Sequence, residues 1–144
     1  MNKIKISIHP SFLLLLIIGL FGGFIKELSC FVFIIFLHEI AHLIASQIFN
    51  VKYYTIHLTI IGCMIDLGDY SNISLWKQFI INIAGICVNG ILIILFNIFK
   101  IDFLIEYNKF MIIFNLLPIP PLDGYKIIYN LLSIIFDDEY INDC

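Results

Sequence analysis

The stretch Phe36-Leu37-His38-Glu39-Ile40-Ala41-His42-Leu43 carries three ionisable side chains inside apolar sequence. The surrounding run extends from Leu28 to Phe49, and its 22 residues are enough for a helix to cross a hydrocarbon core of about 30 Å. A charged side chain inside such a helix costs roughly 2.5 to 3.5 kcal/mol. Three ionisable groups at such close spacing therefore indicate a site that compensates for this cost.

The spacing of the two histidines predicts a metal site. Positions four residues apart lie on one face of a helix, so the imidazoles of His38 and His42 can reach the same ion. Glu39 follows a ligand directly and projects to the adjacent side. This is the HExxH pattern of zinc metalloproteases, in which the glutamate is the general base. The alternative interpretation is a polar patch that bonds neighbouring helices.

The composition predicts an integral membrane protein. Of 144 residues, 61% are apolar and 13% are charged, whereas a soluble domain is about half apolar and a quarter charged. The formal net charge is -3, and all eight basic residues are lysines. No basic face for nucleic acid is indicated. The four cysteines lie far apart and predict neither a disulfide framework nor a thiolate zinc site.

Four hydrophobic segments predict an all-α polytopic membrane protein with about four transmembrane segments. The first extends from Ser7 to Ile25, the second is the run described above, and the third extends from Phe79 to Phe99. The fourth, Phe103 to Phe136, is broken by three prolines within residues 117–124, which a continuous helix cannot contain. Broken backbone at membrane depth must be packed in protein or line a wet cavity.

The connection between the second and third segments predicts a short interfacial β-hairpin over Tyr53–Asp69, because polar and apolar residues alternate there. The expected organisation is one domain over residues 1–136 and a short acidic tail over 137–144, without a regulatory domain. Lys3 and Lys5 weakly favour a cytoplasmic N-terminus for this multi-pass cell-membrane protein.

A catalytic zinc normally has three protein ligands, so the chain must supply a third. The residues alone leave several candidates: Asp123, His57, His9, Asp66 and the cysteines. Asp123 is the best of them, since the prolines before it expose backbone and Gly124 after it allows a tight turn. A simple interfacial turn at this point is the alternative interpretation.

Two motifs together carry a resemblance to a known family. The element His38-Glu39-Ile40-Ala41-His42 precedes Asn115-Leu116-Leu117-Pro118-Ile119-Pro120-Pro121-Leu122-Asp123-Gly124 by about 80 residues. In this combination the chain resembles the site-2 protease family of intramembrane zinc metalloproteases. The opening His9-Pro10 is similar to the branch typified by stage IV sporulation protein FB. The resemblance covers Ile6 to about Phe136.

The resemblance implies a role for each matching residue and one Zn²⁺ per chain. Glu39 would be the catalytic carboxylate, and Asn115 and Pro121 would help to bind substrate. Three residues would be metal ligands: His38, His42 and Asp123. The family often has a proline after Ala-Gly in its third core span, but here Ala84-Gly85 is followed by Ile86. A close helix approach through Gly85 is still expected, while a kink is in doubt.

The expected function is zinc-dependent intramembrane cleavage of a membrane-associated precursor protein, by resemblance a sporulation sigma-factor precursor. An anti-sigma factor or a signal-peptide remnant is the alternative substrate, and a non-hydrolytic metal-binding membrane scaffold is the alternative class. The expected partners are the protein substrate and the lipid bilayer. The resemblance also allows inhibitory membrane proteins and a homo-oligomer, and nucleic acid is not expected.

Overall fold

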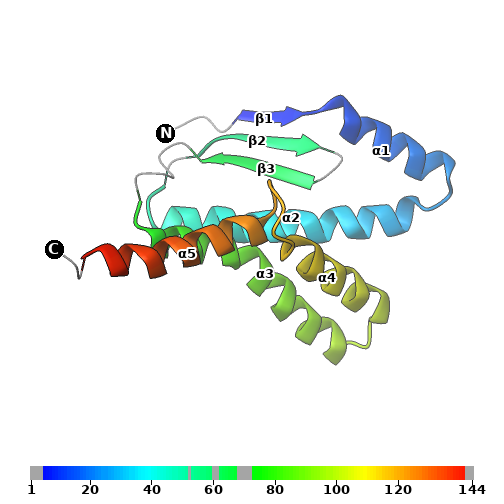
Figure 1. The fold of residues 1–144 in the computed structure, drawn as a ribbon. Helices are drawn as coiled ribbons and strands as arrows, with labels where there is room; N and C mark the ends of the chain where they lie inside the picture. The colour runs from blue at the N-terminus through cyan, green and yellow to red at the C-terminus, as the bar shows by residue number, and fades with distance from the viewer. Residues whose placement is uncertain (1–4, 52, 60–61, 68–72, 142–144) are drawn as a thin grey trace.

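The fold is a helical assembly with a small sheet on one side. A computed structural model describes residues 5–51, 53–59, 62–67 and 73–141. The elements follow one another as β1 (Lys5–Ile8), α1 (Pro10–Phe21), α2 (Ile25–Ile48), β2 (Tyr53–Thr59), β3 (Gly62–Leu67), α3 (Leu75–Ile98), α4 (Asp102–Asn115) and α5 (Asp123–Ile141) (Figure 1).

Within the described part of the chain, two helices are long and apolar enough to cross a membrane. These are α2 and α3, with 24 residues each. The structure thus supports an integral membrane protein with two candidate spans, where the sequence predicted about four. The predicted third segment corresponds to α3, and the predicted break in the fourth is confirmed, since residues 116–122 separate α4 from α5.

The predicted first span does not form one helix. Ser7 lies in β1, and α1 has only 12 residues, which corresponds to about 18 Å at about 1.5 Å per residue. That length is too short for a hydrocarbon core of about 30 Å. Gly23 follows with a φ of 76°, a left-handed conformation that glycine adopts readily and that ends the helical run. Apolar composition alone could not locate these boundaries.

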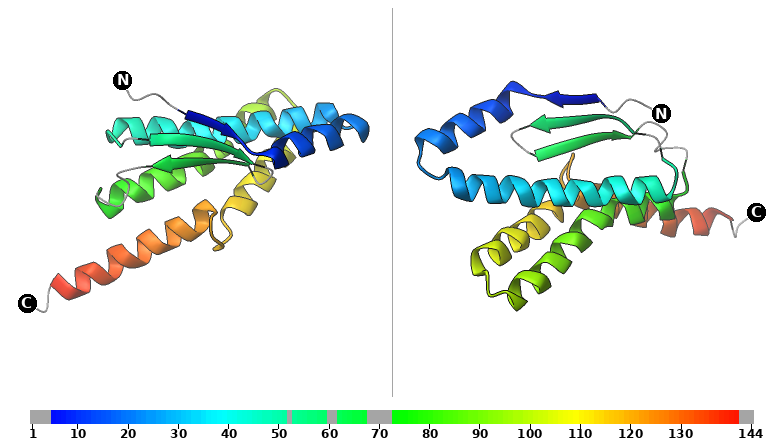
Figure 2. Two further views of the ribbon diagram at one scale, coloured as in Figure 1. Left: turned by 90° about the horizontal axis from the view of Figure 1, so that it is seen from above. Right: turned by 180° about the vertical axis from the view of Figure 1, so that it is seen from behind.

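The predicted hairpin is present as β2 and β3, which pair antiparallel with Tyr53 opposite Leu67 and Thr59 opposite Gly62. The predicted end of the hairpin at Asp69 lies outside the described residues. A third strand, which was not predicted, extends the sheet. β1 pairs parallel with β2, with Lys5 opposite Thr55, so the strand order is β1-β2-β3. The sheet lies beside α2, as Figures 1 and 2 show from different sides.

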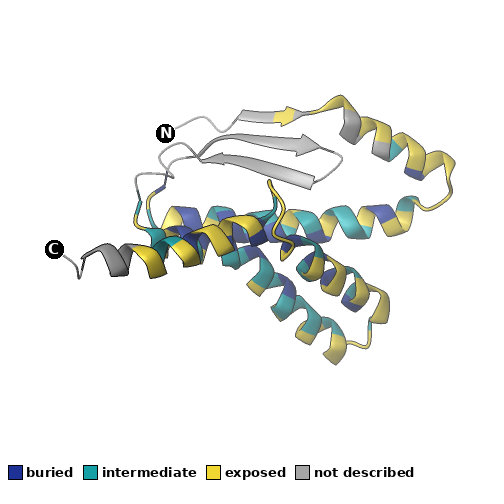
Figure 3. Cartoon of the chain, viewed as in Figure 1, coloured by how far each residue is buried: buried dark blue, intermediate teal, exposed yellow. Residues whose placement is uncertain are grey.

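The helices pack around an interior in which about half of the described buried residues are polar. α3 packs against α2, α4 and α5. The buried residues gather where these helices meet, while the outward faces are exposed (Figure 3). Large apolar side chains such as Phe33 and Ile94 are exposed, as expected for surfaces that face lipid. One small apolar cluster is formed by Ala45, Val51 and Ile81.

The polar interior is built from one face of each helix. On α3 the buried face comprises Gln78, Ile81, Asn82, Gly85 and Asn89. These positions recur every three or four residues, which is the spacing of one helical face. In lipid, buried polar side chains bond neighbouring helices or line functional sites. The face of α3 that meets α2 is therefore where the sequence-predicted chemistry should lie.

Candidate metal centre

α2 presents His38 and His42 on one face, one helical turn apart. The ring centroids are 4.8 Å apart and the ring planes are inclined at 75°. The two Nε2 atoms approach to 3.1 Å. Both residues are buried, with 1% of His38 and 8% of His42 exposed. The prediction that the two imidazoles converge on one point is confirmed.

Asp123 completes the group from the other end of the chain. It is the first residue of α5, directly after the proline-containing break. Its Oδ2 lies 3.0 Å from Nε2 of His38 and 3.0 Å from Nε2 of His42. The next residue is Gly124, and the site leaves no space for a larger residue, because a Cβ there would collide with the backbone of Leu116 and Leu117. The end of α4 can therefore press against the start of α5 and fix Asp123 in place.

These three residues fit a divalent metal ion. Their ligand atoms are 3.0 to 3.1 Å from one another. Ligands at about 2.0–2.1 Å from a tetrahedral zinc are about 3.3 Å apart, so small movements would suffice. Two imidazole nitrogens and a carboxylate oxygen that face one another away from water need shared protons or a cation. Within the described residues, this is the one group of three or more such side chains that could hold a metal.

A backbone carbonyl fixes the orientation of His42. Nδ1 of His42 donates a hydrogen bond to the carbonyl oxygen of Ile81 at 2.7 Å. The proton therefore resides on Nδ1, and the lone pair of Nε2 points toward the other two ligand atoms. Such partners are usual for metal-binding histidines because they set the tautomer and the ring orientation. No side-chain pattern in the sequence reveals this contact, since any residue at position 81 offers a carbonyl.

Gly85 allows α3 to approach the two imidazoles. A Cβ at this position would lie 2.5 Å from Cε1 and Nε2 of His38 and 2.5 Å from Nε2 of His42. Real Cβ atoms essentially never come so close to other heavy atoms. The close approach that was expected from the Ala84-Gly85 element is therefore present, although the family's proline is missing.

The second carboxylate oxygen of Asp123 faces a cation. Nζ of Lys126 lies 3.9 Å from Oδ1, one turn further along α5. The lysine side chain is half exposed, so it can keep its charge solvated. Lys126 was not among the predicted site residues, but its position three residues after an acid on the same helix is a detectable signal.

The other predicted residues lie around the group. Glu39 is partly buried on α2, next to His38. Asn115, at the end of α4, is buried, and its Nδ2 donates to the carbonyl oxygen of Met111 at 3.0 Å. Pro121 is exposed in the break before α5. The structure thus places both predicted substrate-binding residues at the two ends of the segment that leads to Asp123.

Of the alternative third ligands, those whose side chains are described lie outside the group. His9 is exposed between β1 and α1. His57 and Asp66 lie on β2 and β3, and their side chains are outside the described set. Cys30 and Cys87 are free thiols. Among the candidates whose side chains are described, Asp123 is the one that meets both histidines.

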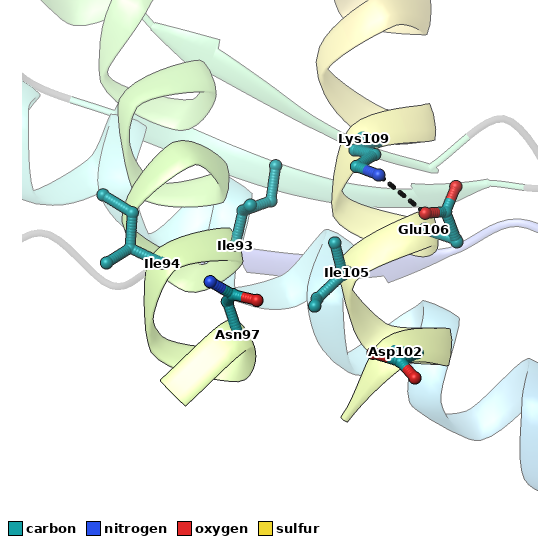
Figure 4. A pocket seen from close by; sticks show the side chains of 7 residues that line it. All are labelled: Ile93, Ile94, Asn97, Asp102, Ile105, Glu106 and Lys109. Carbon is teal, nitrogen blue, oxygen red and sulfur yellow. Dashed lines mark hydrogen bonds and ion pairs between the residues drawn. The ribbon is translucent and has the colours of Figure 1, made fainter. Parts of the chain in front are cut away.

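A separate hollow of about 460 Å³ lies between the far ends of α3 and α4 (Figure 4). Its lining comprises Ile93, Ile94, Asn97, Asp102, Ile105, Glu106 and Lys109. The only ion pair drawn there joins Lys109 to Glu106 at 2.7 Å. None of the predicted site residues lines this hollow, so the chemistry belongs to the buried group on α2 and α5.

The chain is similar to a curated protein and to a solved structure. Stage IV sporulation protein FB of Bacillus subtilis is 29% identical over 147 residues, which cover 92% of this chain and 51% of that protein. The chain therefore spans about half the length of this curated relative. The solved structure of the site-2 protease from Methanocaldococcus jannaschii matches with a TM-score of 0.70 and 26% identity, over 92% of this chain and 69% of that one. No family model matches the chain.

Proposed function

Because the chain is a homologue of the site-2 proteases, we propose that it is a zinc-dependent intramembrane endopeptidase. One observation carries the proposal: the buried convergence of His38, His42 and Asp123, whose ligand atoms lie within 4.8 Å of one another. Asp123 is 81 and 85 positions from the two histidines along the chain. A purely structural polar patch would not require a carboxylate from so distant a segment to meet both imidazoles at one oxygen.

Different residues of this chain would bind the metal and transfer the proton. His38, His42 and Asp123 would hold the ion, which leaves a tetrahedral centre one further position. Bound zinc would supply Lewis-acid chemistry, making hydroxide available near neutral pH and polarising the scissile carbonyl. The carboxylate of Glu39 takes the proton of the attacking water and returns it to the nitrogen of the leaving amine. Its position directly after a ligand keeps this carboxylate beside the centre.

The sheet offers a place for an unwound substrate. A helical substrate hides its peptide bonds in its own hydrogen bonds, so it must unwind before attack. β3 is an edge of the described three-stranded sheet and packs against α2, the helix that carries the histidines. An extended segment can add to such an edge through main-chain hydrogen bonds. Asn115 and Pro121 would engage the same segment from the other side of the centre.

The proposed substrate is a membrane-associated precursor protein. The similarity to stage IV sporulation protein FB supports a precursor that functions in sporulation, namely a sigma-factor precursor. An anti-sigma factor and a signal-peptide remnant are the competing substrates. The exposed apolar surfaces of α2 and α3 would keep the enzyme in the bilayer, where such substrates meet it.

The test uses three tagged membrane proteins, namely a sporulation sigma-factor precursor, an anti-sigma factor and a signal-peptide remnant. Each is co-expressed with the wild-type chain or with Glu39→Gln. A shortened product with the wild type alone supports the proteolytic function, and the tagged protein that is shortened identifies the substrate class. A shortened product with the wild-type chain and also with Glu39→Gln would refute the role of Glu39. If a zinc-loaded wild type cleaves none of the three, the scaffold function is favoured instead.

A further inference from the structure

The ring of His38 has one polar atom without a hydrogen bond. Its Nδ1 is buried and has no hydrogen-bond partner among the described residues. If Nε2 of His38 holds the metal, as the proposed function requires, Nδ1 must carry the proton. A metal-binding histidine almost always donates this N–H to an acceptor, as His42 does here to Ile81. A buried N–H without an acceptor is costly, so a partner should be close.

The register between α2 and α3 places a candidate acceptor beside this ring. His42 contacts Ile81, and His38 meets Gly85, so the two helices run antiparallel. Asn89 lies one turn beyond Gly85 on the same buried face of α3. It therefore lies beside the turn of α2 that precedes His38. Side chains on a helix lean toward its N-terminus, which directs the His38 ring to this same layer.

Asn89 is itself unusual among the polar residues of the interior. It has no exposed surface, and neither its Oδ1 nor its Nδ2 has a hydrogen-bond partner among the described residues. A buried amide that satisfies neither atom is rare in folded proteins. Its Oδ1 can supply the acceptor that Nδ1–H of His38 needs.

α4 supplies the complementary acceptor for the other end of this amide. The ring of Phe31, on α2, packs against the rings of Tyr107 and Phe110. The distances between the ring centroids are 5.8 and 5.9 Å. Asn108 is therefore held close to α2, two turns before the histidine pair begins. Asn108 is fully buried, and its Nδ2 donates to the carbonyl oxygen of Leu104 at 2.7 Å. Oδ1 of Asn108 remains a buried acceptor with no hydrogen-bond partner in the described part of the chain.

We infer that Asn89 is a positioning residue that holds His38 in its metal-binding tautomer. Nδ1–H of His38 is joined to Oδ1 of Asn89, and Nδ2–H of Asn89 to Oδ1 of Asn108, through one buried water at each step, with the nitrogen as the donor each time. Each donor in this series of hydrogen bonds has an acceptor, and the last acceptor is the carbonyl oxygen of Leu104. One polar relay thus satisfies the unpartnered Nδ1 of His38, both amide atoms of Asn89 and the oxygen of Asn108.

The inference predicts a defined effect on zinc affinity. Loss of such a partner typically lowers metal affinity 10- to 100-fold. Asn89→Leu keeps the branched shape and the number of heavy atoms and removes both polar atoms, so it should weaken zinc binding by about this factor. Asn130→Leu is the matched control, because Asn130 is 2% exposed and also has an unpartnered Nδ2, but lies on α5. Its zinc affinity should stay at the wild-type value.

The experiment measures zinc by competition with a chromophoric chelator on the full chain purified in detergent. A second readout is the Nδ1–H proton of His38 in zinc-loaded protein labelled with ¹⁵N-histidine, assigned by its absence in His38→Ala. This proton should be shifted downfield and exchange slowly in the wild type and in Asn130→Leu. In Asn89→Leu it should move upfield and exchange faster. A structural role of Asn89 would not change this signal selectively.

Asn89→Asp keeps an acceptor oxygen and should retain both the proton signal and most of the zinc affinity. It also provides the decisive comparison if Asn89→Leu does not fold. Zinc affinity and a proton signal in Asn89→Leu equal to those of Asn130→Leu would overturn the inference, as would loss of the signal in Asn89→Asp. A wild-type chain that binds no zinc would instead refute the proposed function, so the two failures are distinguishable.

Discussion

Replacing Gly85 by alanine should weaken zinc binding, because the added methyl group has no space. Its carbon would lie 2.5 Å from Nε2 of both His38 and His42. Non-bonded heavy atoms prefer about 3.5–4.0 Å, so the rings would have to retreat by about 1 Å. Ligand distances in metal sites are held within about 0.2 Å. A displacement of this size therefore moves both nitrogens out of ligand range.

The magnitude follows from the cost of overpacking. An extra methylene in a filled interior costs typically about 1–3 kcal/mol. In the metal-free protein the two imidazoles would move away from the added methyl group. Zinc binding would require them to return to their ligand positions, so this cost weakens the binding free energy by the same amount. At about 1.36 kcal/mol per tenfold change, zinc affinity should fall about 5- to 150-fold.

Gly90→Ala is the matched control on the same helix. A Cβ at Gly90 meets nothing within 4 Å. Both substitutions gain about the same 0.5–1 kcal/mol of helical stability over glycine, so the difference between them isolates the clash with the histidines. Zinc affinity is measured by chelator competition on both purified variants. Equal affinity in Gly85→Ala and Gly90→Ala would refute the close approach of α3 to the ligands.

Further predictions follow from Asp123 and its surroundings. Asp123→Ala should lower zinc occupancy by metal analysis, since a centre with two ligands is incomplete; unchanged occupancy would mean that another residue is the third ligand. Gly124→Ala should have the same effect, because its Cβ would collide with the backbone of Leu116 and displace α5; occupancy equal to that of wild type would contradict this packing. Glu106→Gln breaks only the exposed pair with Lys109. The free energy of unfolding, measured by thermal unfolding, should fall by at most about 0.5 kcal/mol. A larger fall would show that the pair is more than a surface contact.

The local features of this protein follow from its residue pattern. Residue spacing on one helix fixes that His38 and His42 share a face, and alternation of polar and apolar residues was enough to predict the hairpin of β2 and β3. The prolines within residues 117–124 were enough to predict the break between α4 and α5. These features depend on helix and strand periodicity and on proline geometry, all of which operate over a few residues.

Contacts between distant parts of the chain follow from the packing of the helices and the sheet. The sequence left Asp123 as one of several candidate ligands, and the structure brings its Oδ2 to 3.0 Å from both histidines. The carbonyl of Ile81 became the partner of His42, although backbone groups leave no mark in the residue pattern. β1 joined the sheet as a parallel strand because the chain returns through α1 and α2. Long-range packing sets such contacts, and local propensity contains no information about it.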